Sequence, residues 1–184
     1  KQHGKEVVYD AEHFFDGFKA NPEYALSTLQ AAILGGATSV ALCDTNGGML
    51  PSWMAEVVQA AAATGAKLGI HCHNDTACAV ANTLAAVEAG VMHVQGTFNG
   101  YGERTGNADL SALIPNLQLK YGWDVLPPEQ LADLTRVAHA IALVAHQPLL
   151  GRQPYVGHSS FAHKAGLHAS AIRVDENLYQ HTDP

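Results

Sequence analysis

Apolar and polar positions alternate along the chain in two different ways. Four short apolar runs rich in Val, Ile or Leu are typical of buried strands. The stretches between them carry apolar residues three and four positions apart, which predicts amphipathic helices. The expected strands cover residues 7–9, 39–43, 68–73 and 91–96.

Capping and turn residues separate these runs. Asn21 and Pro22 open the first helix, because Asn caps a helix and Pro fits its first turn. Pro51 opens the next helix in the same way. The last three strands each begin just after a helix-ending glycine. This order of elements repeats every roughly 25–30 residues, which predicts βα units and a parallel sheet.

The part of the chain beyond residue 105 has a different pattern. Helical spacing predicts helices over 107–121, 127–144 and 159–173. The segment 147–157 contains two prolines and is expected to be a linker. The chain is therefore expected to be α/β in its first part and to continue as a helical extension.

Length and composition narrow the possibilities. The chain has 184 residues, whereas a complete eight-fold α/β barrel takes about 250. A net charge of −7 without a Lys/Arg cluster argues against a nucleic-acid groove. The apolar runs are too short for a membrane span, and the polar start does not resemble a secretory leader. Cys43, Cys72 and Cys78 form no CxxC pair, so we expect a reducing, cytoplasmic setting.

Polar residues follow each of the four expected strands, and the sharpest group is His71-Cys72-His73. Side chains alternate along a strand, so both imidazoles are expected on one face and Cys72 on the other. Two imidazoles at the carboxyl edge of a parallel sheet can hold one divalent cation. The alternative is a pair of surface or core histidines, since the chain has 11 histidines and chance pairs are common.

Other candidates are weaker on the residues alone. Glu12 is either a solvent-exposed or capping carboxylate or an acid/base group at the first strand end. Thr45 is either a turn hydroxyl or a donor to an anionic substrate. The Gly-rich segment 99–107 matches neither a P-loop nor GxGxxG and is by default a long loop. His168 lies in a helix-like context, where histidines more often pack than react.

Five strings together resemble the metal-dependent acyltransferases that comprise the 2-isopropylmalate, homocitrate and citramalate synthases. The segments 10–17 and 114–120 most resemble the citramalate synthases. The string GERTGN favours the synthases over related lyases such as HMG-CoA lyase, which carry a Cys-containing loop there. The five strings are YDAE (9–12), CDTNGG (43–48), GIHCHND (69–75), GYGERTGN (100–107) and FAHKAGLH (161–168).

The resemblance implies roles for the site residues. His71 and His73 would bind a divalent metal (Mg, Mn or Zn), and Asn107 would complete or support that site. Thr45 would hold the carboxylate of pyruvate. Glu12 would act in acid/base chemistry at the keto carbon, and His168 would help to remove a proton from acetyl-CoA, often from the partner subunit of a homodimer. The implied reaction is the condensation of acetyl-CoA with pyruvate to (R)-citramalate and CoA, which feeds isoleucine synthesis.

The resemblance also implies a partial TIM (β/α)8 barrel. Family members carry an Arg-Asp pair at the end of the first barrel strand, and this chain has no matching string. We therefore expect strands 5–8 of the barrel within residues 1–122, a closing helix over 123–147, and a linker with a helical subdomain over 148–184. The isolated chain is expected to be inactive. The alternatives are a 2-isopropylmalate or homocitrate synthase, a carbon–carbon lyase, or an inactive fragment that acts only in dimerisation.

Overall fold

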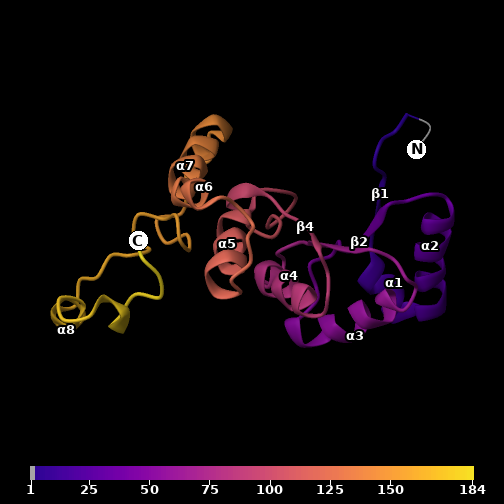
Figure 1. Cartoon of the computed structure of the whole chain (residues 1–184), viewed down its shortest axis with the longest axis horizontal. Helices are drawn as coiled ribbons and strands as arrows, with labels where there is room; N and C mark the ends of the chain where they lie inside the picture. The colour runs from indigo at the N-terminus through magenta and orange to yellow at the C-terminus, as the bar shows by residue number, and fades with distance from the viewer. Residues whose placement is uncertain (1–2) are drawn as a thin grey trace. The chain divides into compact units, whose positions relative to one another are not determined.

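A four-stranded parallel sheet forms the centre of the first part of the chain (Figure 1). The computed structural model describes residues 3–184, and the chain divides into two compact units, Lys1–Leu110 and Ser111–Pro184. The strands pair in the order in which they occur along the chain. They are β1 (Val8–Ala11), β2 (Ser39–Asp44), β3 (Leu68–Cys72) and β4 (His93–Gln95).

Helices connect the strands of the first unit. Their apolar faces bury Leu29, Met54 and Val58 completely, and the strands contribute Leu42 and Ile70 to the same core. α1 and α2 contact β2, and α4 contacts β3. The predicted βα units are thus present. The helices are α1 (Phe14–Ala20), α2 (Pro22–Leu34), α3 (Pro51–Ala62) and α4 (Ala79–Glu88).

Local residues explain most helix boundaries. The Asn21 side chain accepts the Tyr24 N–H at 3.0 Å, so α2 begins where the Asn-Pro pair predicts. α1 was not predicted; it forms because Phe14 and Phe15 are both buried. α4 begins at Ala79, where the Asn74 side chain accepts the Ala79 N–H at 3.1 Å across a loop.

The strand register determines which side chains share a face. Cys43 pairs with His71, and His71 pairs with Gln95. Paired residues of neighbouring strands point to the same side of a sheet, so these three side chains lie on one face. Cys72 is 1% exposed and lies on the opposite face. β3 ends at Cys72, and a short helix, η1 (Phe98–Gly100), follows β4.

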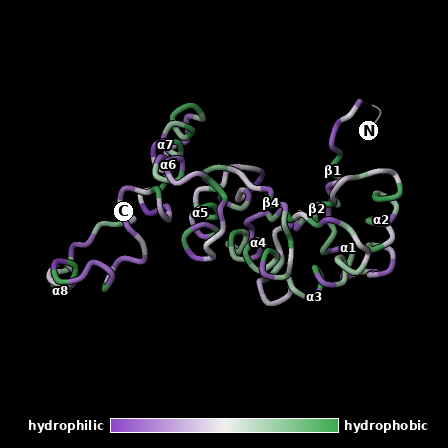
Figure 2. Tube along the Cα trace, viewed as in Figure 1, coloured by the Kyte–Doolittle hydropathy of each residue, from purple (hydrophilic) through white to green (hydrophobic). Residues whose placement is uncertain are grey.

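The second unit is helical. None of the helices within residues 3–184 is both long and apolar enough to cross a membrane. Figure 2 shows hydrophobic residues along α7, and Leu143 and Val144 on this helix are exposed. Its elements are α5 (Leu110–Pro115), the π-helical turn η2 (Asn116–Lys120), α6 (Pro128–Ala132), α7 (Leu134–Ala145), α8 (Gly166–Ile172) and η3 (Glu176–Leu178).

These helices differ from the predicted ones at several places. The first begins at Leu110 and not at residue 107. Pro115 lacks an N–H, and the chain widens into a π-helical turn directly after it. The predicted helix over 127–144 is divided between α6 and α7 at Asp133. Residues 159–165 are not helical, because the Ser159 N–H and the Ser160 hydroxyl bond to carbonyls of Gly151 and Gln153 instead.

Candidate active site

The carboxyl ends of the four strands meet at one edge of the sheet, and three of the predicted site residues come together there. His71 and His73 have ring centroids 5.2 Å apart, so they lie on one face as the alternation along β3 predicts. Asn107 approaches from the Gly-rich loop, and its side-chain nitrogen is 2.9 Å from His71 Nε2. Its backbone forms an isolated antiparallel bridge with His73. Two imidazoles and one amide therefore lie together at this edge of the sheet.

A chain of hydrogen bonds orients His71. Asp10 accepts from Gln95 Nε2 at 2.9 Å, which turns Gln95 Oε1 toward the histidine. His71 Nδ1 donates to that oxygen, also at 2.9 Å. His71 therefore carries its proton on Nδ1, and Nε2 presents a lone pair. A metal-binding histidine needs this arrangement, because the nitrogen that does not bind the metal is held by a hydrogen-bond acceptor.

His73 provides a second uncharged nitrogen. Its Nδ1 is buried and, within residues 3–184, has no hydrogen-bond partner. Burial lowers the pKa of His73, and the neighbouring His71 and Arg104 lower it further, so the neutral form is favoured. A buried nitrogen without a partner is costly unless a ligand satisfies it.

The pair therefore fits a divalent cation as part of a ligand set. Neutral imidazole nitrogens suit Zn, Mn and similar ions. In the described part of the chain no third His, Cys, Asp or Glu joins the two histidines. Asn107 donates to the lone pair of His71 Nε2, so a cation bound there would replace this hydrogen bond.

Thr45 lies in the loop after β2, which is held from several sides. Its hydroxyl oxygen accepts the His13 N–H at 2.7 Å, which leaves the hydroxyl hydrogen available to donate to a ligand. His13 adopts a left-handed conformation (φ 57°) at the start of α1. The Asp44 carboxylate accepts the N–H groups of Gly48 and Met49 at 3.1 and 3.2 Å. Thr45 thus sits on a loop with defined hydrogen bonds at both ends.

The other two predicted residues are less constrained. Glu12 follows β1 at the same edge of the sheet and is exposed. Burial raises the pKa of the Cys43 thiol to about 12, and the negative charges of Asp10 and Glu12 contribute to this rise. His168 belongs to α8 in the second unit, where its ring stacks on Tyr179 with centroids 4.0 Å apart. The ring centroid of His163 lies 5.8 Å from that of His168.

Three residues of this site are not among the predicted site residues. Gln95 and Arg104 bond to predicted site residues far away in the chain, and Asp44 holds the loop that carries Thr45. Gln95 carried one signal, because it stands at the end of an apolar strand, where a polar residue is expected to face the site.

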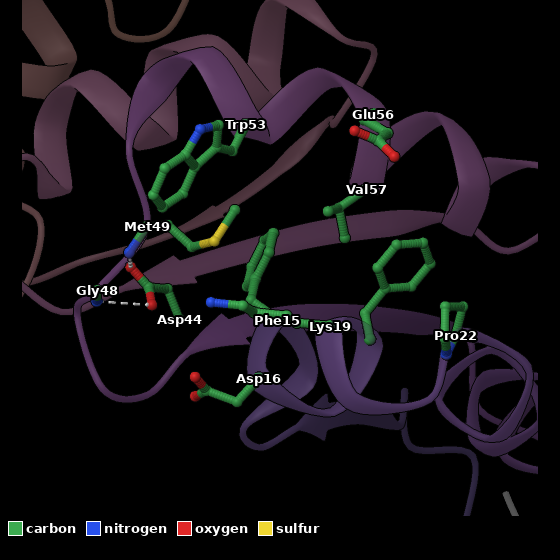
Figure 3. A pocket seen from close by; sticks show the side chains of 11 residues that line it. Phe15, Asp16, Lys19, Pro22, Asp44, Gly48, Met49, Trp53, Glu56 and Val57 are labelled. Atoms are coloured by element: carbon green, nitrogen blue, oxygen red, sulfur yellow. Dashed lines mark hydrogen bonds between the residues drawn. The ribbon is translucent and has the colours of Figure 1, made fainter.

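A cavity of about 440 Å³ lies apart from the histidine pair, in the helical layer of the first unit (Figure 3). Phe15, Phe18, Trp53 and Val57 make it largely apolar, and charged residues of α1 and α3 lie around it. Neither His71 nor His73 lines it. The polar edge of the sheet, rather than this cavity, is therefore the candidate active site.

Comparison with known proteins agrees with the geometry. The HMGL-like family model matches residues 1–141. The chain belongs to the HMGL-like family. Over the whole length of this chain, it is 60% identical to an (R)-citramalate synthase of Streptomyces coelicolor and 54% identical to one of Aquifex aeolicus. The resemblance to the citramalate synthases is confirmed.

The chain covers only 35% of each of these two relatives. Its fold is similar to that of an HMG-CoA lyase from Bacillus subtilis, with a TM-score of 0.60 and 24% identity. That match covers 69% of this chain and 44% of the lyase. The expected α/β fold with a parallel sheet and TIM-barrel relatives is confirmed.

Proposed function

We propose that this chain is the C-terminal half of the catalytic barrel of a citramalate synthase, with β1–β4 as barrel strands 5–8. The observation that carries the proposal is the 60% and 54% identity, over the whole of this chain, with two proteins of that name. The neighbouring His71, His73 and Asn107 side chains support it, because the reaction requires a group that withdraws electrons from a ketone, such as a metal ion that two histidines could hold. The barrel portion would extend to residue 122, with a closing helix over 123–147 and a separate helical part over 148–184.

The polar edge would bind the 2-oxo acid. His71 and His73 would hold a divalent cation (Mg, Mn or Zn), with Asn107 at its side. When bound, such a cation supplies Lewis-acid polarisation of the ketone. The Thr45 hydroxyl would donate to the carboxylate of pyruvate, which fits its available hydrogen.

The reaction is a Claisen-type condensation. A base, assisted by His168, removes a proton from the methyl group of acetyl-CoA, and the carbon that becomes nucleophilic attacks the keto carbon of pyruvate. One C–C bond forms, and the keto oxygen takes up a proton, a step in which Glu12 would act. Water then cleaves the thioester, which releases CoA and (R)-citramalate.

The proposal includes the setting of the protein. The whole protein would be a cytoplasmic homodimer that feeds isoleucine synthesis from pyruvate and acetyl-CoA. The chain by itself would be inactive, because within residues 3–184 no Asp or Glu joins the two histidines as a further ligand.

The test is CoA release by the full-length protein that carries this sequence. We expect turnover with pyruvate and acetyl-CoA, loss of turnover in EDTA and its return on adding a divalent metal. Turnover with 2-oxoisovalerate or 2-oxoglutarate but not with pyruvate would refute pyruvate as the substrate, while the proposed condensation reaction would stand. Cleavage of 3-hydroxy-3-methylglutaryl-CoA without any condensation would refute the synthase and favour a lyase.

A further inference from the structure

One guanidinium group connects three loops at the polar edge of the sheet. Arg104 belongs to the Gly-rich loop after β4 and adopts a left-handed conformation (φ 56°). Its Nε donates to Asp75 Oδ1 at 2.7 Å, and one terminal nitrogen donates to Asp75 Oδ2 at 2.8 Å. The same terminal nitrogen donates to the Thr45 carbonyl oxygen at 2.7 Å. Loops that follow β2, β3 and β4 are thereby joined at one residue.

The Asp75 segment also holds the Thr45 loop directly. The Thr76 hydroxyl and the Thr76 N–H both donate to the Gly47 carbonyl oxygen, at 2.9 and 3.1 Å. Asp75 packs so closely on Gly47 that a Cβ there would stand 2.8 Å from the Asp75 nitrogen. Arg104 therefore bonds to a segment that is already seated against the loop, and its bond to the Thr45 carbonyl adds an anchor at the residue itself.

The contribution of this arrangement is geometric. The side chain of Arg104 is 45% exposed and that of Asp75 is 26% exposed, and exposed ion pairs add little to global stability. A planar guanidinium nevertheless fixes direction, because its two parallel bonds to a carboxylate leave one orientation for the remaining donor. That donor bonds to the carbonyl oxygen of Thr45, while the hydroxyl oxygen of Thr45 accepts the His13 N–H.

We propose that Arg104 is a positioning residue for binding of the 2-oxo acid: it holds the Thr45 peptide so that the Thr45 hydroxyl points at the carboxylate of the acid. The inference rests on the proposed function. Arg104 acts through Thr45, so it governs the affinity for the 2-oxo acid and has little effect on the affinity for acetyl-CoA.

The experiment uses the full-length protein with Arg104→Met and Arg104→Lys. For Arg104→Met we expect the KM for pyruvate to rise about tenfold, the order expected for the loss of one charge-assisted hydrogen bond. The KM for acetyl-CoA should change less than about twofold, because Arg104 bonds to Asp75 and Thr45 and to none of the residues assigned to acetyl-CoA. Arg104→Lys should recover little, because an ammonium group cannot bond to the carboxylate and the carbonyl in the same plane.

A double-mutant cycle separates positioning from general structure. In a Thr45→Val background the hydroxyl is gone, so Arg104→Met should change the KM for pyruvate by less than about twofold. Arg136→Met is the matched control, since Arg136 pairs with Asp133 through the same two nitrogens but bonds to no residue of the site. It should change neither KM.

Two results would overturn the inference. One is an equal rise in the pyruvate KM on Arg104→Met whether or not the protein also carries Thr45→Val. The other is unchanged hydrogen exchange of residues 44–49 in Arg104→Met, a readout that needs no activity and should show faster exchange. Faster exchange in a protein that binds no 2-oxo acid by calorimetry would instead reject the proposed function, and with it the role of Arg104.

Discussion

Alanine at position 47 should destabilise the loop that carries Thr45. Gly47 is buried and has a φ of +63°, in the left-handed region. A non-glycine residue held there costs about 1–2 kcal/mol. The added Cβ would also stand 2.8 Å from the Asp75 nitrogen and closer still to its carboxylate, and a backbone atom cannot move aside cheaply.

The two costs can be combined. Overpacking of this kind adds about 1–3 kcal/mol to the conformational cost, so Gly47→Ala should lower the free energy of unfolding by about 2–5 kcal/mol. For an unfolding unit of about this chain's length, each kcal/mol lowers Tm by about 2–4 °C. We therefore expect Tm to fall by at least about 4 °C.

Gly48→Ala is a matched control at the next position. A Cβ at Gly48 meets nothing within 4 Å, and its φ lies outside the left-handed region. Its Tm should stay within about 2 °C of the parent, as for ordinary surface substitutions. Thermal unfolding of both full-length variants by differential scanning fluorimetry gives the comparison. Equal Tm values for the two variants would refute the close packing of Asp75 on Gly47.

Three further predictions follow from individual contacts. Gln95→Leu should weaken binding of the divalent metal by about tenfold in calorimetry, because the histidine loses its orienting acceptor; unchanged binding would contradict this. Iodoacetamide at pH 8 should label Cys78 before Cys43, whose pKa burial raises to about 12, and peptide mapping that finds the reverse order would refute the burial. Leu29 is fully buried in α2, so Leu29→Ala should lower the free energy of unfolding by about 2–5 kcal/mol in chemical denaturation. Leu34 is 89% exposed in the same helix, so Leu34→Ala should change it by less than about 0.5 kcal/mol, and similar losses in the two variants would show the packing to be wrong.

The elements with strong local signals were predictable. Asn21 and Pro22 place the start of α2 correctly, because the cap is formed by residues three positions apart. The core strands β2 and β3 also match, since their apolar runs are buried on both sides of a parallel sheet. Such features depend on neighbours along the chain, and the sequence contains them in full.

Elements that depend on distant contacts were misplaced or missed. The helix expected from Asn107 begins at Leu110, because Asn107 bonds to His71 and its backbone pairs with His73. α1 was missed, because only the tertiary burial of Phe14 and Phe15 makes it favourable. The predicted helix over 159–173 keeps only its second half, since the first half bonds to the preceding linker.

The sequence by itself determined the α/β order, the positions of the polar strand ends, and the common face of His71 and His73, because each follows from spacing along one segment. Only the tertiary structure decided how these residues are held. Gln95 sets the proton position on His71, and Arg104 joins Thr45 to Asp75, through hydrogen bonds that span from 24 to 59 positions of the chain. No local pattern encodes such bonds, because they exist only once the parallel sheet has brought the ends of its strands to one edge.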